Sequence, residues 1–229
     1  MKNFIVLLLI VISISARASD ITADKRLYLG IIENNIEYVE QAINDGAYLN
    51  KKYNQDYTPL SLACTINSKP IIIKKLINAG ADFRFENSKK ENLLAIALNQ
   101  SANAETIQML INYGLNPNDK NNKGKTALYT GLIHKAPYEA IVALLQNGAN
   151  TNIPFEYKGN PVYPLTLAVL LGSPREIIKV LIKYSNQDAQ FQALTAAITI
   201  NDTKTYQLFK DSGLLKEQHN TIHDDTDGD

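Results

Sequence analysis

One short phrase recurs along the chain at a fixed interval. It reads LINAGADF from Leu76, and related versions, AINDGAYL, LINYGLNP and LLQNGANT, begin at Ala42, Leu110 and Leu144. The glycines of these phrases follow one another by 34 residues and are Gly46, Gly80, Gly114 and Gly148. Repeats of this length are typical of solenoid proteins, because one small unit cannot bury its own apolar side and must stack on its neighbours.

Each repeat contains two segments with helical periodicity, separated by a polar break. The copy from Tyr57 reads YTPLSLACTINSKPIIIKKLINAGADF. Thr58 is suited to cap the first helix, and Pro59 to its first turn, where no backbone donor is needed. We expect the second helix over Ile71–Ala79, ended by Gly80 in the left-handed conformation. The pattern therefore predicts a helical hairpin in every repeat.

The recurring elements T-P-L-x-x-A and L-x-x-G-A-D resemble the ankyrin repeat from about Leu27 to Leu215. Four leucines take the same place in this pattern, and two more fit it in the outer repeats: Leu60, Leu94, Leu128 and Leu165, then Leu27 and Leu194. The resemblance implies an all-α ankyrin-repeat solenoid of about six helix-turn-helix units with finger loops, spanning residues 19–216. It also implies a concave face, made by the first helices and the loop tips, that binds other proteins.

The spacing departs from the pattern in three places. The middle repeats hold 20 residues between leucine and glycine (Leu60 to Gly80), and the outer ones hold 19 (Leu27 to Gly46), so we expect the extra residue in the turn between helices. The loop around Pro154–Pro161 is three residues longer and should protrude. Lys183–Asn186 replaces the glycine turn, and the link to a helix at Ala189 is too short for a finger, which predicts a cap.

The first residues have the three parts of an export signal. Lys2 precedes an apolar run, and Ala16-Arg17-Ala18 forms an A-x-A site. We therefore expect residues 1–18 to be a signal peptide cleaved after Ala18, and the mature protein to be periplasmic or secreted, without a stable membrane anchor. Removal of Lys2 and Arg17 leaves 21 of the 23 basic side chains against 23 acidic ones, a net charge of about −2 that argues against nucleic-acid binding.

Residues that carry chemistry are few. The single cysteine, Cys64, fits a small buried apolar residue. His134 lies near the end of a first helix, where the repeat pattern points it to the concave face, and no nucleophile accompanies it. His219 and His223 lie in residues 217–229, which we expect to be a flexible acidic tail, although an H-x-x-x-H pair beside aspartates could also bind a metal. We expect no catalytic residue, resident metal or cofactor, and hence no enzyme.

Aromatic and basic residues interleave in the four connecting loops. Tyrosine and arginine often anchor protein interfaces, because they bury much area with few rotatable bonds or make forked polar contacts. The candidate partner-binding residues are Tyr53, Tyr57, Arg84, Phe85, Lys120, Lys123, His134, Phe155, Tyr157, Lys158 and Tyr163. The alternative is structural, since loops are commonly charged and Tyr57 and Tyr163 precede helices, where they could staple neighbouring repeats.

Two functions of a non-catalytic, monomeric binding protein fit these features. Export and architecture resemble those of bacterial periplasmic immunity proteins, which bind and neutralise secreted antibacterial toxins such as type VI lipase effectors. The alternative is a periplasmic scaffold or stress-protection protein that binds an endogenous enzyme. No residue motif in the chain specifies the partner.

Overall fold

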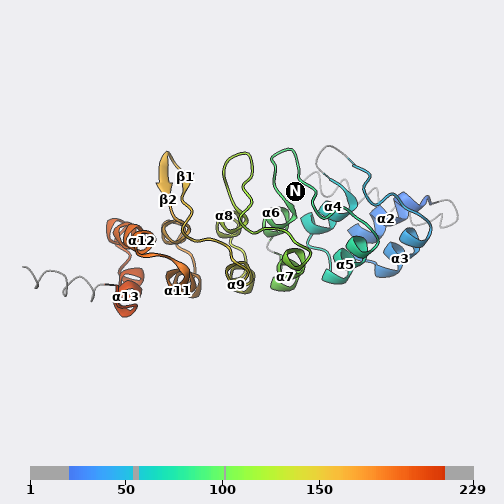
Figure 1. Ribbon diagram of the computed structural model, residues 1–229. Coiled ribbons are helices and arrows are strands. Elements are labelled where there is room, and N and C mark those ends of the chain that lie inside the picture. The colour runs from blue at the N-terminus through green and yellow to red at the C-terminus, as the bar shows by residue number, and fades with distance from the viewer. Residues whose placement is uncertain (1–20, 54–56, 101, 215–229) are drawn as a thin grey trace, which may run out of the picture. The chain divides into compact units, whose positions relative to one another are not determined.

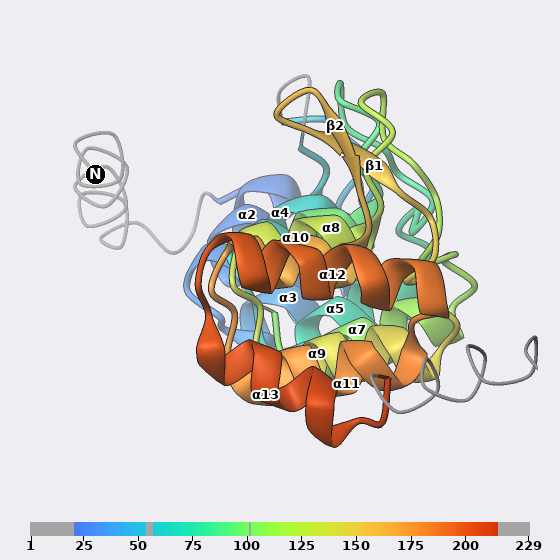
Figure 2. The ribbon, with the colours of Figure 1, turned by 90° about the vertical axis from the view of Figure 1, so that its left-hand side faces the viewer.

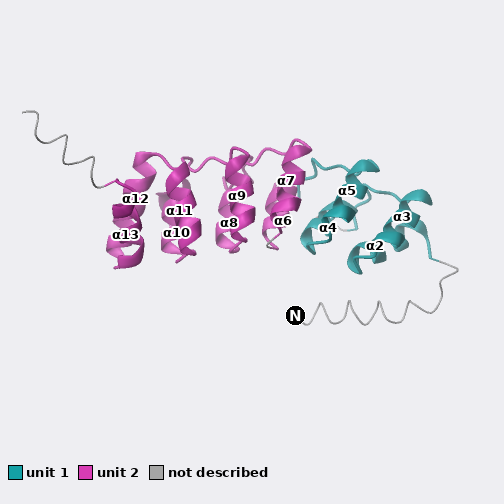
Figure 3. Cartoon of the chain, turned by 90° about the horizontal axis from the view of Figure 1, so that it is seen from below, with its two compact units in different colours: residues 1–88 teal, residues 89–229 magenta. Residues whose placement is uncertain are grey.

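The structure is a computed structural model that describes residues 21–53, 57–100 and 102–214. Its contacts divide the chain into two compact units, residues 1–88 and 89–229 (Figure 3). Unit 1 contains the helices α2 (Ala23–Ile32), α3 (Ile36–Asn44), α4 (Pro59–Thr65) and α5 (Pro70–Asn78). The predicted signal peptide, the histidines of the tail and the cleavage site lie outside the described residues.

Unit 2 continues the same alternation of short helices. It contains α6 (Leu93–Leu98), α7 (Ala104–Asn112), α8 (Ala127–Ile133), α9 (Tyr138–Gln146), α10 (Pro164–Leu170), α11 (Arg175–Tyr184), α12 (Gln187–Thr199) and α13 (Thr203–Asp211). It also contains two strands, β1 (Phe155–Tyr157) and β2 (Asn160–Val162). Within each unit, first helices pack on first helices and second helices on second helices (Figure 1). The described residues thus form six helical pairs, and the prediction of an all-α repeat solenoid is confirmed.

The ends of the helices are those that the sequence indicates. Thr58 caps α4, accepting from the backbone N–H of Ser61 while the Ser61 hydroxyl accepts from the backbone N–H of Thr58. Helix α5 begins and ends one residue earlier than expected, because Pro70 occupies its first turn. Gly80 follows with a φ of +101°, and nothing lies within 4 Å of the position of a Cβ atom, so the backbone conformation and not crowding favours glycine.

The core lies between the stacked helices of each unit. The equivalent leucines of the repeats have at most 1% exposure, except Leu194 with 6%, and are Leu27, Leu60, Leu94, Leu128, Leu165 and Leu194. Burial of a whole leucine side chain contributes about 1.5–3 kcal/mol. This row of leucines therefore holds each stack together, as the repeat pattern predicted.

The turns between paired helices explain the two repeat lengths. In the first pair Asn34, with a φ of +52°, is followed directly by the N-cap residue Asn35. In the second pair Asn67, with a φ of +54°, is followed by Ser68 and then the N-cap residue Lys69. The extra residue thus lies in the turn, and the prediction is confirmed.

The long loop of the fourth repeat is a β-hairpin, which the sequence analysis did not predict. Phe155 pairs with Val162 and Tyr157 with Asn160 in an antiparallel ribbon. Lys158 and Gly159 connect the strands with φ values of +50° and +80°, the signs that a tight hairpin turn requires. Figure 2 shows the hairpin rising beside α12, so the loop protrudes as expected.

The last helical pair forms the expected cap. Only Ser185 and Asn186 separate α11 from α12, and the Asn186 side chain accepts from the backbone N–H of Ala189 at 3.0 Å. Helix α12 therefore begins at Gln187, two residues before the expected start.

Candidate protein-binding surface

Four connecting loops form the surface on which the sequence places most candidate contacts. We name them finger 1 (residues 46–57), finger 2 (80–91), finger 3 (114–125) and finger 4 (148–163). Each leads from the second helix of one pair to the first helix of the next. The boundary between the two units falls in finger 2, so residues 80–88 belong to unit 1 and residues 89–91 to unit 2.

Asparagine side chains fasten the bases of the fingers to the following repeat. In unit 1, the Asn50 amide donates to the carbonyl oxygen of Gly80 at 3.2 Å and accepts from the backbone N–H of Asp82 at 2.7 Å. In unit 2, the Asn118 amide does the same with Gly148 and Asn150, both at 2.8 Å. A primary amide suits this place because it carries a donor and an acceptor side by side.

Positions 84 and 152 correspond to Asn50 and Asn118 at the spacing of 34 residues. They differ in the hydrogen bonds that their side chains can make. Asn152 accepts from the backbone N–H of Asn186 at 2.7 Å, which fastens finger 4 to the cap. Arg84 occupies the corresponding place in finger 2, and its guanidinium has no acceptor atom. Its backbone N–H donates to the Asp82 carboxylate, and its side chain is exposed.

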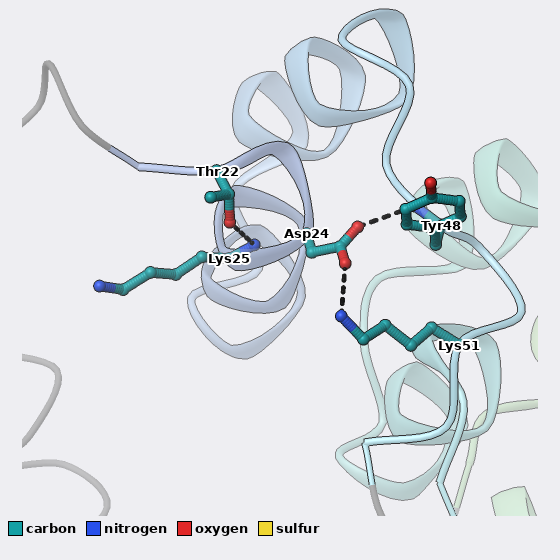
Figure 4. Close-up of polar contacts among 5 residues, drawn as sticks. All are labelled: Thr22, Asp24, Lys25, Tyr48 and Lys51. Atoms are coloured by element: carbon teal, nitrogen blue, oxygen red, sulfur yellow. Dashed lines mark hydrogen bonds and ion pairs between the residues drawn. The ribbon is translucent and has the colours of Figure 1, made fainter.

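Finger 1 is tied back to the first helix of its own repeat. The Asp24 carboxylate accepts from the backbone N–H of Tyr48 at 2.9 Å and from the Lys51 ammonium at 2.8 Å (Figure 4). The hydrogen bond from Lys51, followed by that from Tyr48, holds the pKa of Asp24 below its usual range. Lys51 is thus paired with a side chain of its own repeat.

Tyr53 and Phe85 of unit 1 stabilise the fingers, whereas Tyr48 in finger 1 is 73% exposed. The Tyr53 ring meets the Tyr28 ring edge-on, with 5.2 Å between centroids, and burial raises the pKa of its hydroxyl. The Lys52 ammonium lies 5.9 Å from the centroid of Phe85, whose side chain is only 7% exposed. The Phe85 ring therefore packs inside the finger layer, and its expected contact with a partner stays a prediction.

A cation held between two aromatic rings links fingers 3 and 4. The Lys125 ammonium lies 4.5 Å from the centroid of Tyr129 and 4.9 Å from that of Phe155, and it donates to the carbonyl oxygen of Glu156. The two rings meet edge-on at 4.6 Å. Burial lowers the pKa of Lys125. Cation–π contacts of partly desolvated lysines contribute on the order of 1 kcal/mol each, so this cluster fixes the hairpin to its neighbour.

The other side of finger 4 is held by the cap. The Gln192 amide of α12 donates to the carbonyl oxygen of Pro161 at 2.9 Å and accepts from the backbone N–H of Tyr163 at 3.0 Å. Finger 3 is in turn joined to finger 2 by the backbone N–H of Asn122, which donates to the carbonyl oxygen of Lys89 at 3.1 Å. The fingers of unit 2 therefore form a laterally bonded row.

The remaining candidate partner-binding residues differ in the exposure of their side chains. Arg84, Lys120, Lys123 and Lys158 are exposed on the fingers, while Tyr53, Tyr57, Tyr157 and Tyr163 are half-buried. Phe155 is 6% exposed, so its ring packs against the fold, and its expected contact with a partner stays a prediction. The β-hairpin turns its ring towards Tyr129, and its neighbour Tyr157 keeps part of its surface accessible.

His134 does not lie with the finger residues. It follows α8 as the C-cap residue and is exposed in the turn before α9. The fingers join the opposite end of α8, and a helix of 7 residues is about 10 Å long. His134 therefore lies apart from the finger candidates, and its expected role in partner binding stays a prediction.

The described residues offer little for catalysis. Cys64 is fully buried, as expected, and burial raises its pKa to about 12, so the thiol stays protonated at neutral pH. Among residues 21–53, 57–100 and 102–214, no three histidine, cysteine or acidic side chains come together as a metal site. The same residues contain no helix long and apolar enough to cross a membrane.

Several residues that fasten the fingers escaped the sequence analysis. Asn50, Asn118 and Asn152 each follow a repeated glycine by four residues. This regular position in the repeat could have revealed them. Gln192 carried no such signal, because its role depends on the place of α12 beside the hairpin.

Comparison with known families agrees with this architecture. Residues 66–155 match the family model described as ankyrin repeats in three copies. A search for similar curated proteins found no match. The helical pairs and this match fit an all-α ankyrin-repeat solenoid, and ankyrin repeats indicate a protein-binding module.

Proposed function

We propose that the protein is an exported immunity protein, which binds a secreted antibacterial toxin in the periplasm and covers it with its fingers. The observation that carries the proposal is the bonded row of fingers in unit 2. Lys125 and Gln192 hold finger 4 from its two sides, whereas Lys120, Lys123 and Lys158 remain exposed beside it.

A row that is ordered before binding favours tight association. Ordering a flexible loop on binding costs about 0.5–1.5 kcal/mol for each immobilised side chain, and fingers bonded to one another avoid part of this cost. The exposed lysines add an electrostatic attraction that raises the association rate with an acidic partner. Both properties suit a protein that must inactivate a toxin before the toxin acts.

The place of action rests on the amino-terminal residues. The charged start, the apolar run and the A-x-A site of residues 1–18 support export. We expect Ser19 as the mature N-terminus in the periplasmic fraction, to be checked by terminal sequencing. Retention of Met1 on a cytoplasmic protein would remove the export argument and, with it, the immunity role.

The partner itself provides the decisive experiment. The full chain, tagged at its C-terminus, is produced in its host, cross-linked in the periplasm and purified, and captured proteins are identified by mass spectrometry. Each captured protein is then directed alone to the periplasm of a test strain. An immunity role predicts growth arrest that is relieved by this protein and is not relieved by a variant without residues 2–18. Capture of a harmless endogenous enzyme would favour the scaffold function instead.

A further inference from the structure

A second apolar surface lies in unit 2 at the turns between paired helices, and the fingers do not contribute to it. A pocket of about 260 Å³ opens between the turn that follows α8 and the turn that follows α10. Its walls are mainly aliphatic and include Leu132, Ile133, Ala136, Leu171, Pro174 and Ile177. Helices α8 and α10 each begin at a finger and end at such a turn, so the pocket and these fingers lie at opposite ends of the helices.

Exposed apolar side chains extend the surface beyond the pocket. Leu170 precedes a residue of the pocket wall and is 39% exposed. Helix α12 packs against α10, and Ile198 in its last turn and the C-cap residue Ile200 are 59% and 47% exposed. We call these three residues and the pocket the turn patch. Single exposed apolar residues are common, but apolar groups that gather at adjacent turns are typical of interaction sites.

The three turns share one backbone geometry, which supports placing these residues together. The backbone N–H groups of Ala136, Ser173 and Asp202 donate to the carbonyl oxygens five residues earlier at 2.8–2.9 Å. Lys135, Gly172 and Asn201 precede them with φ values of +55°, +61° and +57°. Ile200 therefore occupies the place in its turn that Leu171 occupies in the pocket wall.

The charge around the pocket selects the chemistry of the ligand. Lys135 lines the pocket, and no acidic side chain does. His134 and Arg175 adjoin lining residues and are exposed. Glu176 follows Arg175 in the sequence. Its side chain lines a separate groove together with Tyr138 and Tyr184 of the second helices. The charged side chain in the pocket lining is therefore basic, whereas the pocket floor is apolar. The acidic Asp202 lies two residues after Ile200, next to the α12 end of the turn patch.

The size of the surface distinguishes a protein segment from a small molecule. Small-molecule sites commonly enclose about 300–1,000 Å³, and the pocket is smaller than this. A small ligand in the pocket would also leave Ile198 and Ile200 in water. A protein segment that inserts one aliphatic side chain and lays further apolar residues over α10 and α12 would cover both.

We propose that the turn patch binds a segment of a partner protein in which aliphatic residues are flanked by carboxylates. The aliphatic side chains of the partner segment cover the pocket, Leu170, Ile198 and Ile200. The carboxylates of the segment lie near Lys135 and Arg175. This site is separate from the fingers. One molecule can therefore bind two partners, or bind one partner at both ends of its first helices.

The test uses the full mature chain with isotope-labelled isoleucine and leucine methyl groups. The probes are two blocked peptides, Asp-Glu-Leu-Leu-Asp-Glu and Lys-Lys-Leu-Leu-Lys-Lys. We expect the acidic peptide to shift the methyl signals of Ile133, Ile177 and Ile200, and the basic peptide to bind at least about tenfold more weakly. Leu170→Asp together with Ile200→Asp should abolish the shifts, while Tyr138→Asp on α9 should leave them unchanged. All variants alter exposed residues, and circular dichroism verifies their folding.

Three results would overturn the proposal. Equal affinities of the two peptides would show that the site does not select for carboxylates. In that case Lys135→Glu would not change the affinity for the acidic peptide. If decanoate shifts the methyl signals of the pocket residues and neither peptide does, the pocket is a site for a small ligand. Methyl shifts that appear on raising the protein concentration alone would show that a second copy of the chain covers the patch. None of these results depends on Lys120 or Lys123, so the proposed role of the fingers is tested separately.

Discussion

Single side chains determine how the fingers are presented, and Asp24 is the clearest case. It lies in the first turn of α2, yet its carboxylate holds both the backbone of Tyr48 and the ammonium of Lys51 in finger 1. An aspartate in a first helical turn is ordinarily read as a contribution to helix stability. The sequence could not assign it to a finger because the contact spans 27 residues and depends on the fold.

The lowered pKa of Asp24 leads to a prediction about acid stability. A carboxyl whose pKa is lower in the folded than in the unfolded protein stabilises the fold fully above the unfolded value of 3.8, and this contribution disappears as the pH falls through the folded pKa. Asp24→Asn should therefore be less stable than the natural protein at pH 6. The difference in free energy of unfolding should shrink as the pH is lowered from about 5 to 3.

Urea unfolding followed by circular dichroism at a series of pH values measures this difference. Glu86→Gln serves as the control, because Glu86 is an exposed carboxylate of the same unit. If Asp24→Asn and Glu86→Gln show the same dependence on pH, the bond between Asp24 and Lys51 does not contribute in solution.

At the scale of elements, the sequence predicted helices better than it predicted the fingers. Local chemistry marked the ends of α4 and α5, such as the capping box of Thr58 and the left-handed Gly80, and these ends lie within one residue of the expected place. The hairpin of finger 4 was missed, because its strands are three residues each and the turn residues, Lys158-Gly159, lack the usual asparagine or aspartate. Short-range signals are weak where pairing with neighbours decides the structure.

The hairpin depends on Gln192 more than its own sequence indicates. Gln192→Ala removes the acceptor of the Tyr163 N–H and the donor to the Pro161 carbonyl. We expect the Tyr163 amide to exchange with solvent about two- to tenfold faster, since a lost hydrogen bond of this kind contributes about 0.5–1.5 kcal/mol. Hydrogen–deuterium exchange measures this rate, and Gln187→Ala, an exposed glutamine of the same helix, is the matched control. Unchanged protection of Tyr163 would mean that the strand pairing alone holds the hairpin.

For the whole molecule, the repeat pattern predicted the core but could not show which finger residues are buried by neighbouring fingers. The row of leucines follows from a spacing that every copy repeats, so Leu128 could be placed inside without a structure. The fingers vary between copies, and in them an aromatic residue can face either a partner or a neighbouring finger. Phe85 and Phe155 face their neighbours, and only contacts between repeats could reveal this.

The core of unit 2 should therefore dominate its stability. Leu128→Ala removes a side chain with 1% exposure and should lower the free energy of unfolding by about 2–5 kcal/mol. Lys123→Ala, in the exposed part of finger 3, should change it by less than about 0.5 kcal/mol. Equal effects of the two substitutions in urea unfolding would mean that the leucine row is not the core.

Recognition by the fingers should depend on charge more than on the buried rings. Simultaneous Phe155→Ala and Tyr157→Ala would disturb the cluster around Lys125, so this pair of substitutions cannot separate folding from binding. Lys120→Glu with Lys123→Glu changes only exposed side chains. It should slow association with the captured partner about tenfold or more at low salt, because the attraction that steers the partner becomes repulsion.

The dependence of this loss on salt identifies its cause. The Debye length falls from about 30 Å at 0.01 M to about 8 Å at 0.15 M, so the difference in association rate should shrink over this range while the dissociation rate changes little. Lys204→Glu with Lys210→Glu makes the same change of charge on exposed residues of α13, away from the fingers, and should have a smaller effect. Stopped-flow mixing with the purified partner gives both rates. If the two double variants behave alike, net charge and not the finger row governs association, and the turn patch becomes the site that must account for binding.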